Sequence, residues 1–457
     1  MDLQLDIGNI LAENVGSENG LRREDLEGLA EDMKTYAERI EKRRGKDVGF
    51  MELPYDEQLA DQINCMADQL RRWCRNFVVL GIGGSALGNI TVHRALNHPF
   101  HNMLPIDHPA RGGAPRIFVM DNVDPWKISG LMDIIKEEIP QTAFNVITKS
   151  GGTAETMSQF LSARELLENS EGADPAQQII ATTDTNPEKS LLKRMAQEAG
   201  YETLPIPDNV GGRFSVLSAV GLLSAAVSGV DIDGLFEGAR RADKACRVAD
   251  MSENPAAQFA AALYLQHQNG KPMNVLMPYS EALSGLSDWF CQLWAESLGK
   301  RKDLDGHDVF RGPTPVPSVG VTDQHSTMQL YQDGPFDKVI CFVEVADPGV
   351  EEQPICSEAG ESELDYFEGK TFGELFGSEL EATRAALRTK NKPNCTVRVP
   401  AVTPEALGEL FMFFEYAVTF SSFLYNVNAF DQPGVELGKQ YTYGLMGRKG
   451  YNPPPQA

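Results

Sequence analysis

The sequence lacks an excess of positive charge, a secretion signal and an apolar run long enough to cross a membrane. Its 41 Lys and Arg stand against 65 Asp and Glu, a net charge of −24, and this sign repels nucleic acid and anionic membranes. The longest weakly polar stretch, 215–230, is interrupted by Ser and Gly and is too short to span a bilayer. The first residues, MDLQLDIGNILAENVG, have neither a basic start nor an apolar core. We therefore expect a cytoplasmic protein with no nucleic-acid or membrane partner.

Cysteine and histidine motifs for metal or redox chemistry are also missing. The 7 cysteines are scattered and form no CxxC pair, which is typical of reduced thiols rather than of disulfides or a zinc site. Four of the 7 histidines, at 93, 98, 101 and 108, cluster in or near one loop. Their spacing matches no standard set of metal ligands. A solvated loop is the better interpretation, and we expect no metal.

The pattern of apolar runs predicts an α/β protein. At 457 residues the chain exceeds what one hydrophobic core usually supports, so two or more domains are expected. Short β-branched runs alternate with helical patterns, as in strands buried on both faces of a parallel sheet. The strand candidates are 77–81, 116–121, 145–149 and 179–183 in the first half and 274–278, 316–321, 338–345 and 395–400 in the second.

The same reading divides the chain into five segments. We expect an N-terminal helical segment (1–59), a first domain (60–225), linking helices (226–268), a second domain (269–445) and a C-terminal tail (446–457). Within this division, 22–43 is expected to be a charged helix and 346–369 an acidic, exposed insertion.

A glycine-rich turn follows the first strand candidate. Residues 81–88 read GIGGSALG, and glycines at such a strand-to-helix turn let the backbone approach an anion. The turn also fits a dinucleotide-binding motif, but that motif requires an acidic residue about twenty positions on, at the end of the next strand. The next strand ends at Asp121, too far away, and Asp107 lies in a Pro- and His-rich loop. A nicotinamide-dependent dehydrogenase is therefore disfavoured.

A second turn, TKSGGTAET at 148–156, offers four hydroxyls, one lysine and two glycines. It too follows a strand candidate and precedes a helix, so it is expected to share a crevice with the first turn at the carboxyl edge of the sheet. Ser85 adds a hydroxyl from that first turn. Hydroxyls and backbone N–H groups suit a phosphate monoester. The alternative role of Ser150 or Thr153, capping the following helix, is compatible with phosphate binding.

Two further segments carry candidates for proton transfer and charge stabilisation. Arg213 follows Gly-Gly in DNVGGRFS, where a fixed guanidinium could stabilise a developing oxyanion. Gln292 and Glu296 share one helix face through i,i+4 spacing, and Glu296 stands among apolar residues. A carboxylate in such surroundings loses hydration and becomes a stronger general base.

The last two candidates come late in the chain. His325, in TDQHS, follows a strand candidate and is the histidine best placed to face a ligand. Lys439 comes shortly after a long helix, in FDQPGVELGK; there it could also serve only as the partner of a helix dipole.

Taken together, these motifs resemble the glucose-6-phosphate isomerase family of the bacterial type. DNVGGRFSVLSAVG looks like one family signature and FDQPGVELGK like a second, while GIGGS, TKSGGTAET, QLWAES and TDQHS occur in the family order. The resemblance covers about residues 60–445. It implies two sugar-isomerase (SIS) domains, each with a five-stranded parallel sheet flanked by helices, in a homodimer.

The resemblance also implies roles for individual residues. Glu296 falls on the proton-transfer base and Arg213 on the group that stabilises the enediolate. His325 and Lys439 fall on the ring-opening positions, with His325 entering from the other subunit. The positions implied for phosphate and substrate contact are Gly84, Ser85, Thr148, Lys149 (mainly its backbone), Ser150, Thr153 and Gln432; Gln292, beside Glu296, is a further candidate. The chain departs from many relatives at Gly152, where they carry Thr, and at Thr148, where they carry Ser.

The reaction implied is the interconversion of glucose 6-phosphate and fructose 6-phosphate in glycolysis and gluconeogenesis, without a cofactor. Ring opening precedes proton transfer between C2 and C1 through a cis-enediol, which one carboxylate can perform. A non-catalytic sugar-phosphate sensor on the same domains would have no reason to keep Glu296, His325, Arg213 and Lys439 together. An isomerase that also accepts mannose 6-phosphate remains open as an alternative.

Overall fold

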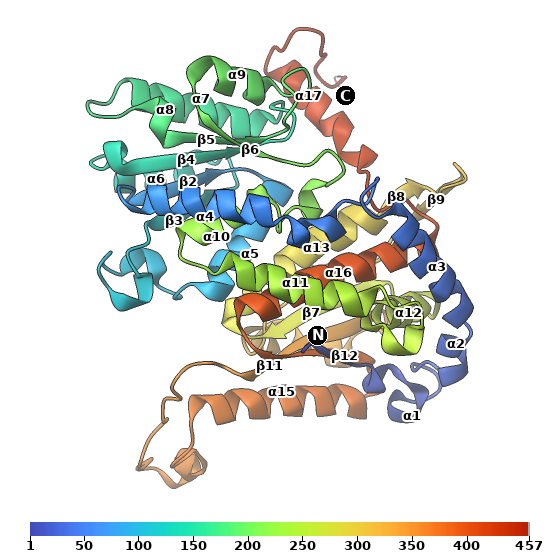
Figure 1. Cartoon of the computed structure of the whole chain (residues 1–457). Helices are drawn as coiled ribbons and strands as arrows, with labels where there is room; N and C mark the ends of the chain where they lie inside the picture. The colour runs from blue at the N-terminus through green and yellow to red at the C-terminus, as the bar shows by residue number, and fades with distance from the viewer. Residues whose placement is uncertain (456–457) are drawn as a thin grey trace.

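The computed structural model describes residues 1–455 and contains two five-stranded sheets, one above the other in Figure 1. Residues 456–457 of the expected tail lie outside the described residues. The first sheet has the order β3-β2-β4-β5-β6, and all its neighbouring strands are parallel. Its strands are β2 (Asn76–Leu80), β3 (Arg116–Met120), β4 (Thr142–Ile147), β5 (Ile179–Thr183) and β6 (Glu202–Pro205).

The second sheet repeats this plan with one antiparallel edge strand. Its order is β1-β12-β11-β7-β10, with β10, β7, β11 and β12 parallel and β1 antiparallel to β12. Its strands are β1 (Gln4–Asp6), β7 (Met273–Tyr279), β10 (Thr314–Pro317), β11 (Lys338–Asp347) and β12 (Asn394–Ala401). A separate hairpin pairs β8 (Lys300–Lys302) with β9 (Asp308–Arg311). The α/β class is confirmed, and the chain's own N-terminus supplies the fifth strand.

Burial on both faces explains why the strands read as continuous apolar runs. In β2, Phe77 and Val79 face the large core between the sheets, whereas Val78 faces the opposite core under α7. In β11, Val339 faces the large core between the sheets, whereas Phe342 faces the opposite core. Parallel strands covered by helices on both sides need apolar residues at successive positions.

Helices form three layers around the two sheets. Figure 1 places α7, α8 and α9 above the first sheet, α15 below the second, and α5, α11, α13 and α16 between them. The helices of the first half are α1 (Ala12–Val15), α2 (Arg23–Glu27), α3 (Ala30–Arg43), α4 (Glu57–Arg71), α5 (Leu87–Leu96), α6 (Pro125–Ile135), α7 (Ala154–Glu168), α8 (Pro175–Gln178), α9 (Leu191–Ala199) and α10 (Ala219–Val227). Those of the second half are α11 (Ile232–Cys246), α12 (Pro255–Gln268), α13 (Ser284–Leu298), α14 (Met328–Asp333), α15 (Phe372–Thr389), α16 (Pro404–Tyr425) and α17 (Glu436–Leu445). The helix expected at 22–43 is therefore two helices, α2 and α3.

The expectation that no apolar run in the sequence is long enough to cross a membrane is wrong for helix α16, which passes by length and composition alone. Its most apolar window has a mean hydropathy of 1.2, and 89% of that window is buried inside the protein. It packs against α11, α12 and α13, so its apolar surface is already covered as the central helix of the core.

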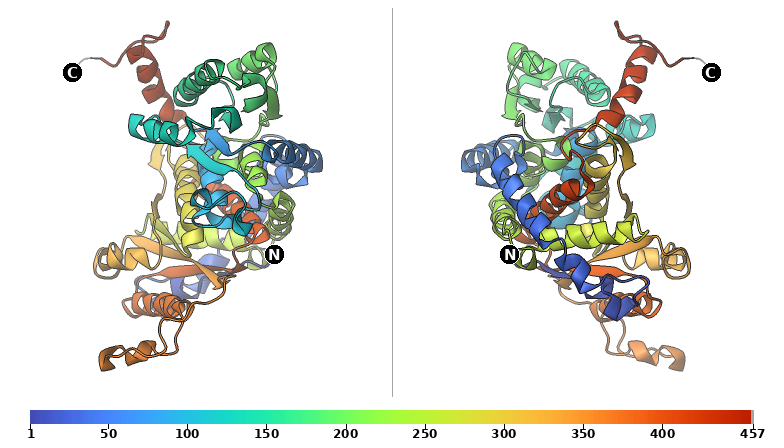
Figure 2. Two further views of the ribbon diagram at one scale, coloured as in Figure 1. Left: turned by 90° about the vertical axis from the view of Figure 1, so that its left-hand side faces the viewer. Right: turned by 90° about the vertical axis from the view of Figure 1, so that its right-hand side faces the viewer.

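Two segments project from the body. The residues between β11 and α15 extend away from the second sheet, and α17 extends from the first (Figure 2). Most of residues 346–369 are exposed, as an acidic insertion requires. None of the residues of α17 is fully buried.

Candidate active site

The Arg213 turn is built by a close approach of two glycine-rich segments. Arg213 lies on the short helix Gly212–Phe214, and Gly84 lies on the short helix Gly83–Ser85. A Cβ atom at Gly84 would stand 2.2 Å from the carbonyl carbon of Gly212, so only glycine allows this contact. Phe214, beside Arg213, is buried against Phe50 and Phe430, which anchors the turn in the core.

Arg213 is a buried cation with five hydrogen-bond acceptors. Its side chain is 2% exposed, and burial lowers the pKa of Arg213 while the charge of Glu296 opposes that shift. Nε donates to Ser297 Oγ at 2.7 Å, and Nη1 donates to Glu296 Oε2 and to Gln432 Oε1, each at 3.0 Å. Nη2 donates to the backbone carbonyls of Ala429 and Asp431. These contacts hold the guanidinium in one orientation.

Glu296 presents its carboxylate from the last turn of α13. One oxygen accepts from Arg213, and the other accepts from Gln292 Nε2 at 3.1 Å across one helical turn. The side chain of Glu296 is 31% exposed, so a ligand can reach it. Gln292 Nε2 would lie 3.0 Å from a Cβ atom at Gly83, which places the glycine turn beside this carboxylate.

Lys300 joins the end of α13 to the segment that carries Gln432. Its Nζ donates to the backbone oxygen of Glu296 at 2.7 Å and lies 3.1 Å from Asp431 Oδ1. Burial lowers the pKa of Lys300, although Asp431 opposes the shift. Together with the bonds from Arg213, this contact holds residues 429–432 against α13.

The hydroxyl-rich turn lies at the start of α7. Thr148 Oγ1 and Thr153 Oγ1 are 3.1 Å apart, and Ser150 Oγ accepts from Gly152 N at 3.2 Å. Thr153 is the N-cap residue of α7, but its side chain makes no capping hydrogen bond. The first N–H groups of α7 therefore keep their capacity to bind an anion beside the hydroxyls. The interpretation of Ser150 or Thr153 as a side-chain cap is wrong, because both hydroxyls are engaged within the turn instead.

Lys149 points away from this turn toward the Arg213 segment. Its Nζ donates to the backbone carbonyls of Asp208 at 2.7 Å and Val210 at 3.3 Å. Burial lowers the pKa of Lys149, against the nearby charges of Asp208 and Asp184. Lys149 therefore offers a phosphate only its backbone. Ser85 follows the carboxyl end of β2, which is adjacent to β4, so the two turns share one edge of the sheet.

His325 and Lys439 stand apart from this cluster. His325 ends the short helix Thr322–His325 and is exposed, and Lys439 on α17 is 50% exposed. Lys439 Nζ bonds to Glu436 Oε1 at 2.8 Å. Within residues 1–455, neither side chain makes a hydrogen bond to Arg213 or Glu296.

A profile of the phosphoglucose isomerase family matches residues 67–448. The chain belongs to the phosphoglucose isomerase family. It is similar to the glucose-6-phosphate isomerase of Carboxydothermus hydrogenoformans, with 43% identity over 99% of this chain and 96% of that protein. The glucose-6-phosphate isomerase of Rubrobacter xylanophilus is 45% identical over 88% of this chain and 90% of its own.

Solved structures agree with this fold. A hypothetical protein from Thermus thermophilus superposes with a TM-score of 0.86 and 34% identity, over 97% of this chain and 100% of that one. A glucose-6-phosphate isomerase from Chlamydia trachomatis superposes with a TM-score of 0.78 and 23% identity, over 93% of this chain and 85% of that one. The second likeness concerns the fold alone.

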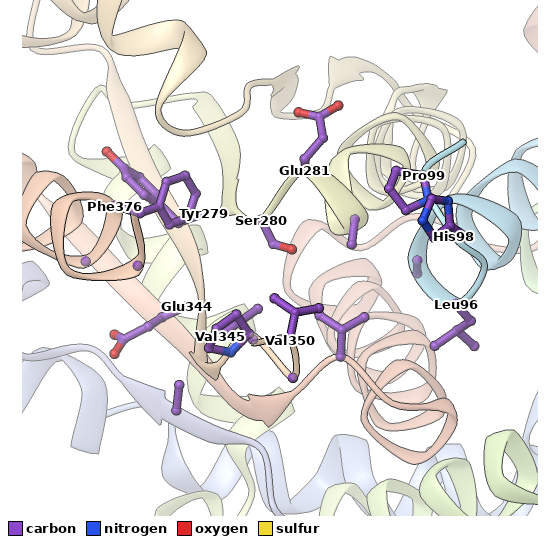
Figure 3. Close-up of a pocket in the computed structure, with 18 of the residues that line it drawn as sticks. Leu96, His98, Pro99, Tyr279, Ser280, Glu281, Glu344, Val345, Val350 and Phe376 are labelled. Carbon is purple, nitrogen blue, oxygen red and sulfur yellow. The ribbon is translucent and has the colours of Figure 1, made fainter. Parts of the chain in front are cut away.

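A large cavity of this phosphoglucose isomerase family member lies elsewhere. It has a volume of about 1140 Å³ and opens at the carboxyl edge of the second sheet, between Tyr279 and Phe376 on one side and His98 on the other (Figure 3). Its two arginines, Arg384 and Arg398, are both paired with Glu344. Since acidic side chains are in excess among its lining residues, the cavity is poorly suited to a sugar phosphate.

Several residues around the site were not among those that the sequence analysis predicted. Ser297 accepts from Arg213, Asp431 contacts Lys300, and the Tyr443 hydroxyl donates to the Gly152 carbonyl at 2.6 Å. Ser297 and Lys300 could have been found, because they follow Glu296 by one and by four residues in the sequence. The others meet the site through contacts between distant segments.

Proposed function

We propose that this phosphoglucose isomerase family member interconverts glucose 6-phosphate and fructose 6-phosphate by proton transfer through a cis-enediol. The observation that carries the proposal is the accessible Glu296 carboxylate, held between the buried Arg213 and Gln292. A single carboxylate beside a fixed guanidinium is what proton transfer next to a developing oxyanion requires.

The steps follow from the residues present. Phosphate binds at the first N–H groups of α7 with the hydroxyls of Thr148, Ser150 and Thr153, and with Ser85. Glu296 takes the proton from C2 of the open-chain aldose and returns it to C1 of the enediol, while the hydroxyl proton on the C2 oxygen passes to the C1 oxygen. Arg213 offsets the negative charge on oxygen in the transition state, and a preorganised donor of this kind contributes about 3–4 kcal/mol. Gln292, Gln432 and the backbone at Gly84 line the approach to Glu296.

Ring opening requires acid–base groups that the Arg213–Glu296 cluster does not supply. We assign this step to His325 and Lys439, and we infer a homodimer in which His325 reaches the partner's site. The exposure of His325 and its lack of a hydrogen bond to Glu296 within residues 1–455 support this assignment. We further propose that the protein acts in the cytoplasm, in glycolysis and gluconeogenesis.

A coupled assay tests the reaction directly. Purified, chelator-treated protein is given fructose 6-phosphate, glucose-6-phosphate dehydrogenase and NADP⁺, and absorbance at 340 nm is followed. We expect the signal to rise, and to stay flat without the coupling enzyme. Loss of activity after chelation, with recovery on adding a divalent ion, would contradict a metal-free mechanism. Failure with fructose 6-phosphate in every condition would refute the proposed reaction.

The composite site has a separate test. His325→Ala and Glu296→Gln subunits, each expected to keep only a small residual turnover and carrying different tags, are co-expressed and the hybrid dimers are purified. We expect partial recovery of activity, since each hybrid contains one intact site. Hybrids that form and stay inactive would show that His325 and Glu296 do not act across an interface.

A further inference from the structure

The turn that carries His325 is held far more tightly than an exposed loop requires. His325 is exposed, and within residues 1–455 its ring makes no hydrogen bond. Its position therefore depends on the backbone of the turn that follows β10. That backbone is restrained on both sides of the histidine.

Asp323, two residues before His325, closes the turn with its carboxylate. Oδ2 accepts from Ser318 Oγ at 2.9 Å and from the Val319 backbone N–H at 2.7 Å. Oδ1 accepts from Ser326 Oγ at 2.6 Å, on the far side of the histidine. Burial works against the charged form, yet these bonds hold the pKa of Asp323 below its usual value. One carboxylate thus ties together residues on either side of His325.

Gln324, the immediate neighbour, fixes the turn to the body of the second half. Its Oε1 accepts from the Tyr279 hydroxyl at 2.8 Å, and its Nε2 donates to Glu379 Oε2 at 3.1 Å. Tyr279 ends β7 and is buried, whereas Glu379 lies on α15. The Tyr279 ring also packs on the turn itself, because a Cβ atom at Gly320 would lie 2.4 Å from it. A rigid strand and a helix therefore set the position of residue 324.

The same loop is tied to the helix that carries Glu296. Ser287 Oγ, on α13, donates to the Ser318 carbonyl at 3.1 Å. Connecting loops run over the protein surface and are usually more mobile than the elements they join, whereas the side chains of Asp323, Gln324 and Ser287 restrain this one. The many side-chain hydrogen bonds of this turn are explained if the direction in which the His325 ring projects matters for its role.

We propose that Asp323 and Gln324 are positioning residues, which hold the turn so that His325 projects in the one direction that its acid–base role uses. The inference rests on the proposed function of His325. Neither residue needs to touch substrate, since both act through the histidine. A shift of about 1 Å in a catalytic group can cost on the order of 10²-fold in rate, so small movements of this turn matter.

The test is a double-mutant cycle with His325→Ala. Asp323→Asn keeps the shape but places an amide nitrogen among the donors of Ser318, Val319 and Ser326. We expect kcat to fall about 10- to 100-fold with KM within about twofold, because phosphate is held by the α7 turn. In the His325→Ala background we expect Asp323→Asn to cause no further loss, since its effect passes through the ring.

Tyr279→Phe is a second and milder substitution for the same double-mutant cycle. It removes only the hydroxyl that Gln324 accepts from, and it keeps the buried ring, so it serves if Asp323→Asn fails to fold. We expect kcat to fall a few-fold, again only when His325 is present. Asp333→Asn is the matched control, because Asp333 pairs with Lys390 on the surface and should leave kcat unchanged.

The outcomes separate the two hypotheses. If His325→Ala lowers kcat but Asp323→Asn and Tyr279→Phe do not, the positioning role is refuted and the function of His325 stands. Equal losses in both backgrounds would also refute it, because the effect would not pass through His325. A His325→Ala variant with wild-type kcat would refute the ring-opening assignment, and the positioning role with it.

Discussion

Two parts of the candidate site differ in how the fold holds them. Arg213 is buried and matched by five acceptors, and Glu296 is gripped between it and Gln292. His325 and Lys439 stand at the surface, on a turn and on an exposed helix. A buried charge must be matched within its own chain, because an unpaired one is costly in low dielectric. Exposed groups have no such constraint, and in the proposed mechanism the partner subunit completes the surroundings of His325.

Removing the base should have the largest effect. Glu296→Gln preserves shape and the contact with Gln292, so folding should survive while turnover falls about 10³- to 10⁴-fold. Exchange of the C2 proton with solvent deuterium, followed by NMR, should disappear. Glu281→Gln, at an exposed glutamate beside the large cavity, is the control and should leave exchange intact. A folded Glu296→Gln variant that binds substrate and still exchanges the proton would rule out Glu296 as the base.

Arg213→Lys should damage both activity and stability. Lysine offers three donors from a single nitrogen, so it cannot reach the five acceptors that surround the planar guanidinium of Arg213. We expect kcat to fall about 10²- to 10³-fold and the free energy of unfolding to fall by about 1–3 kcal/mol, since buried acceptors lose their donor. Steady-state kinetics and thermal unfolding measure the two effects. Arg247→Lys, at an exposed pair with Glu41, should change neither kcat nor the free energy of unfolding. An unaltered Tm in Arg213→Lys would contradict the difference between the buried Arg213 and the exposed groups of the site.

Lys439→Met should separate activity from stability. Its ion pair with Glu436 is on the surface, where such pairs contribute about 0–1 kcal/mol. We expect kcat to fall on the order of 10²-fold, as for other acid–base groups, with little change in Tm. Lys390→Met, which breaks a similar surface pair with Asp333, is the matched control and should keep full activity. A large loss of Tm with normal turnover would mean that Lys439 serves the fold instead.

The hydroxyl turn should give the smallest effect, and it should fall on binding. Ser150→Ala and Thr153→Val remove phosphate donors but leave the N–H groups of α7, so we expect KM to rise about tenfold with kcat little changed. Thr389→Val, at the exposed end of α15, should alter neither constant. Turnover that collapses at constant KM would place this turn in the chemistry rather than in phosphate binding.

The strands show how far local pattern carries. Each of the eight predicted runs overlaps a strand of the two sheets, and most of these strands are buried on both faces, which favours apolar residues at successive positions. The run at 316–321 overlaps β10 only at residues 316–317, and no residue of β10 is fully buried. Besides the β8–β9 hairpin, the pattern misses two strands of the large sheets, β1 and β6, which are short edge strands with exposed positions, so neither periodicity nor apolarity marks them. Strand β1 also pairs with β12, which comes near the other end of the chain. The local sequence of either strand cannot predict a pairing between segments so far apart.

At the site, the sequence by itself determined the local features. These are the Gly-Gly pair that precedes Arg213, the i,i+4 spacing of Gln292 and Glu296, and the hydroxyl residues that follow β4. Each of these depends on neighbours within one turn of chain, where residue type and spacing decide geometry. Only the tertiary structure decided that Arg213 contacts Ser297 and residues 429–432, and that the Lys149 side chain points away from the hydroxyl-rich turn. Those contacts join segments far apart in the chain, and which donor meets which acceptor is settled only when the two sheets and the helices between them pack.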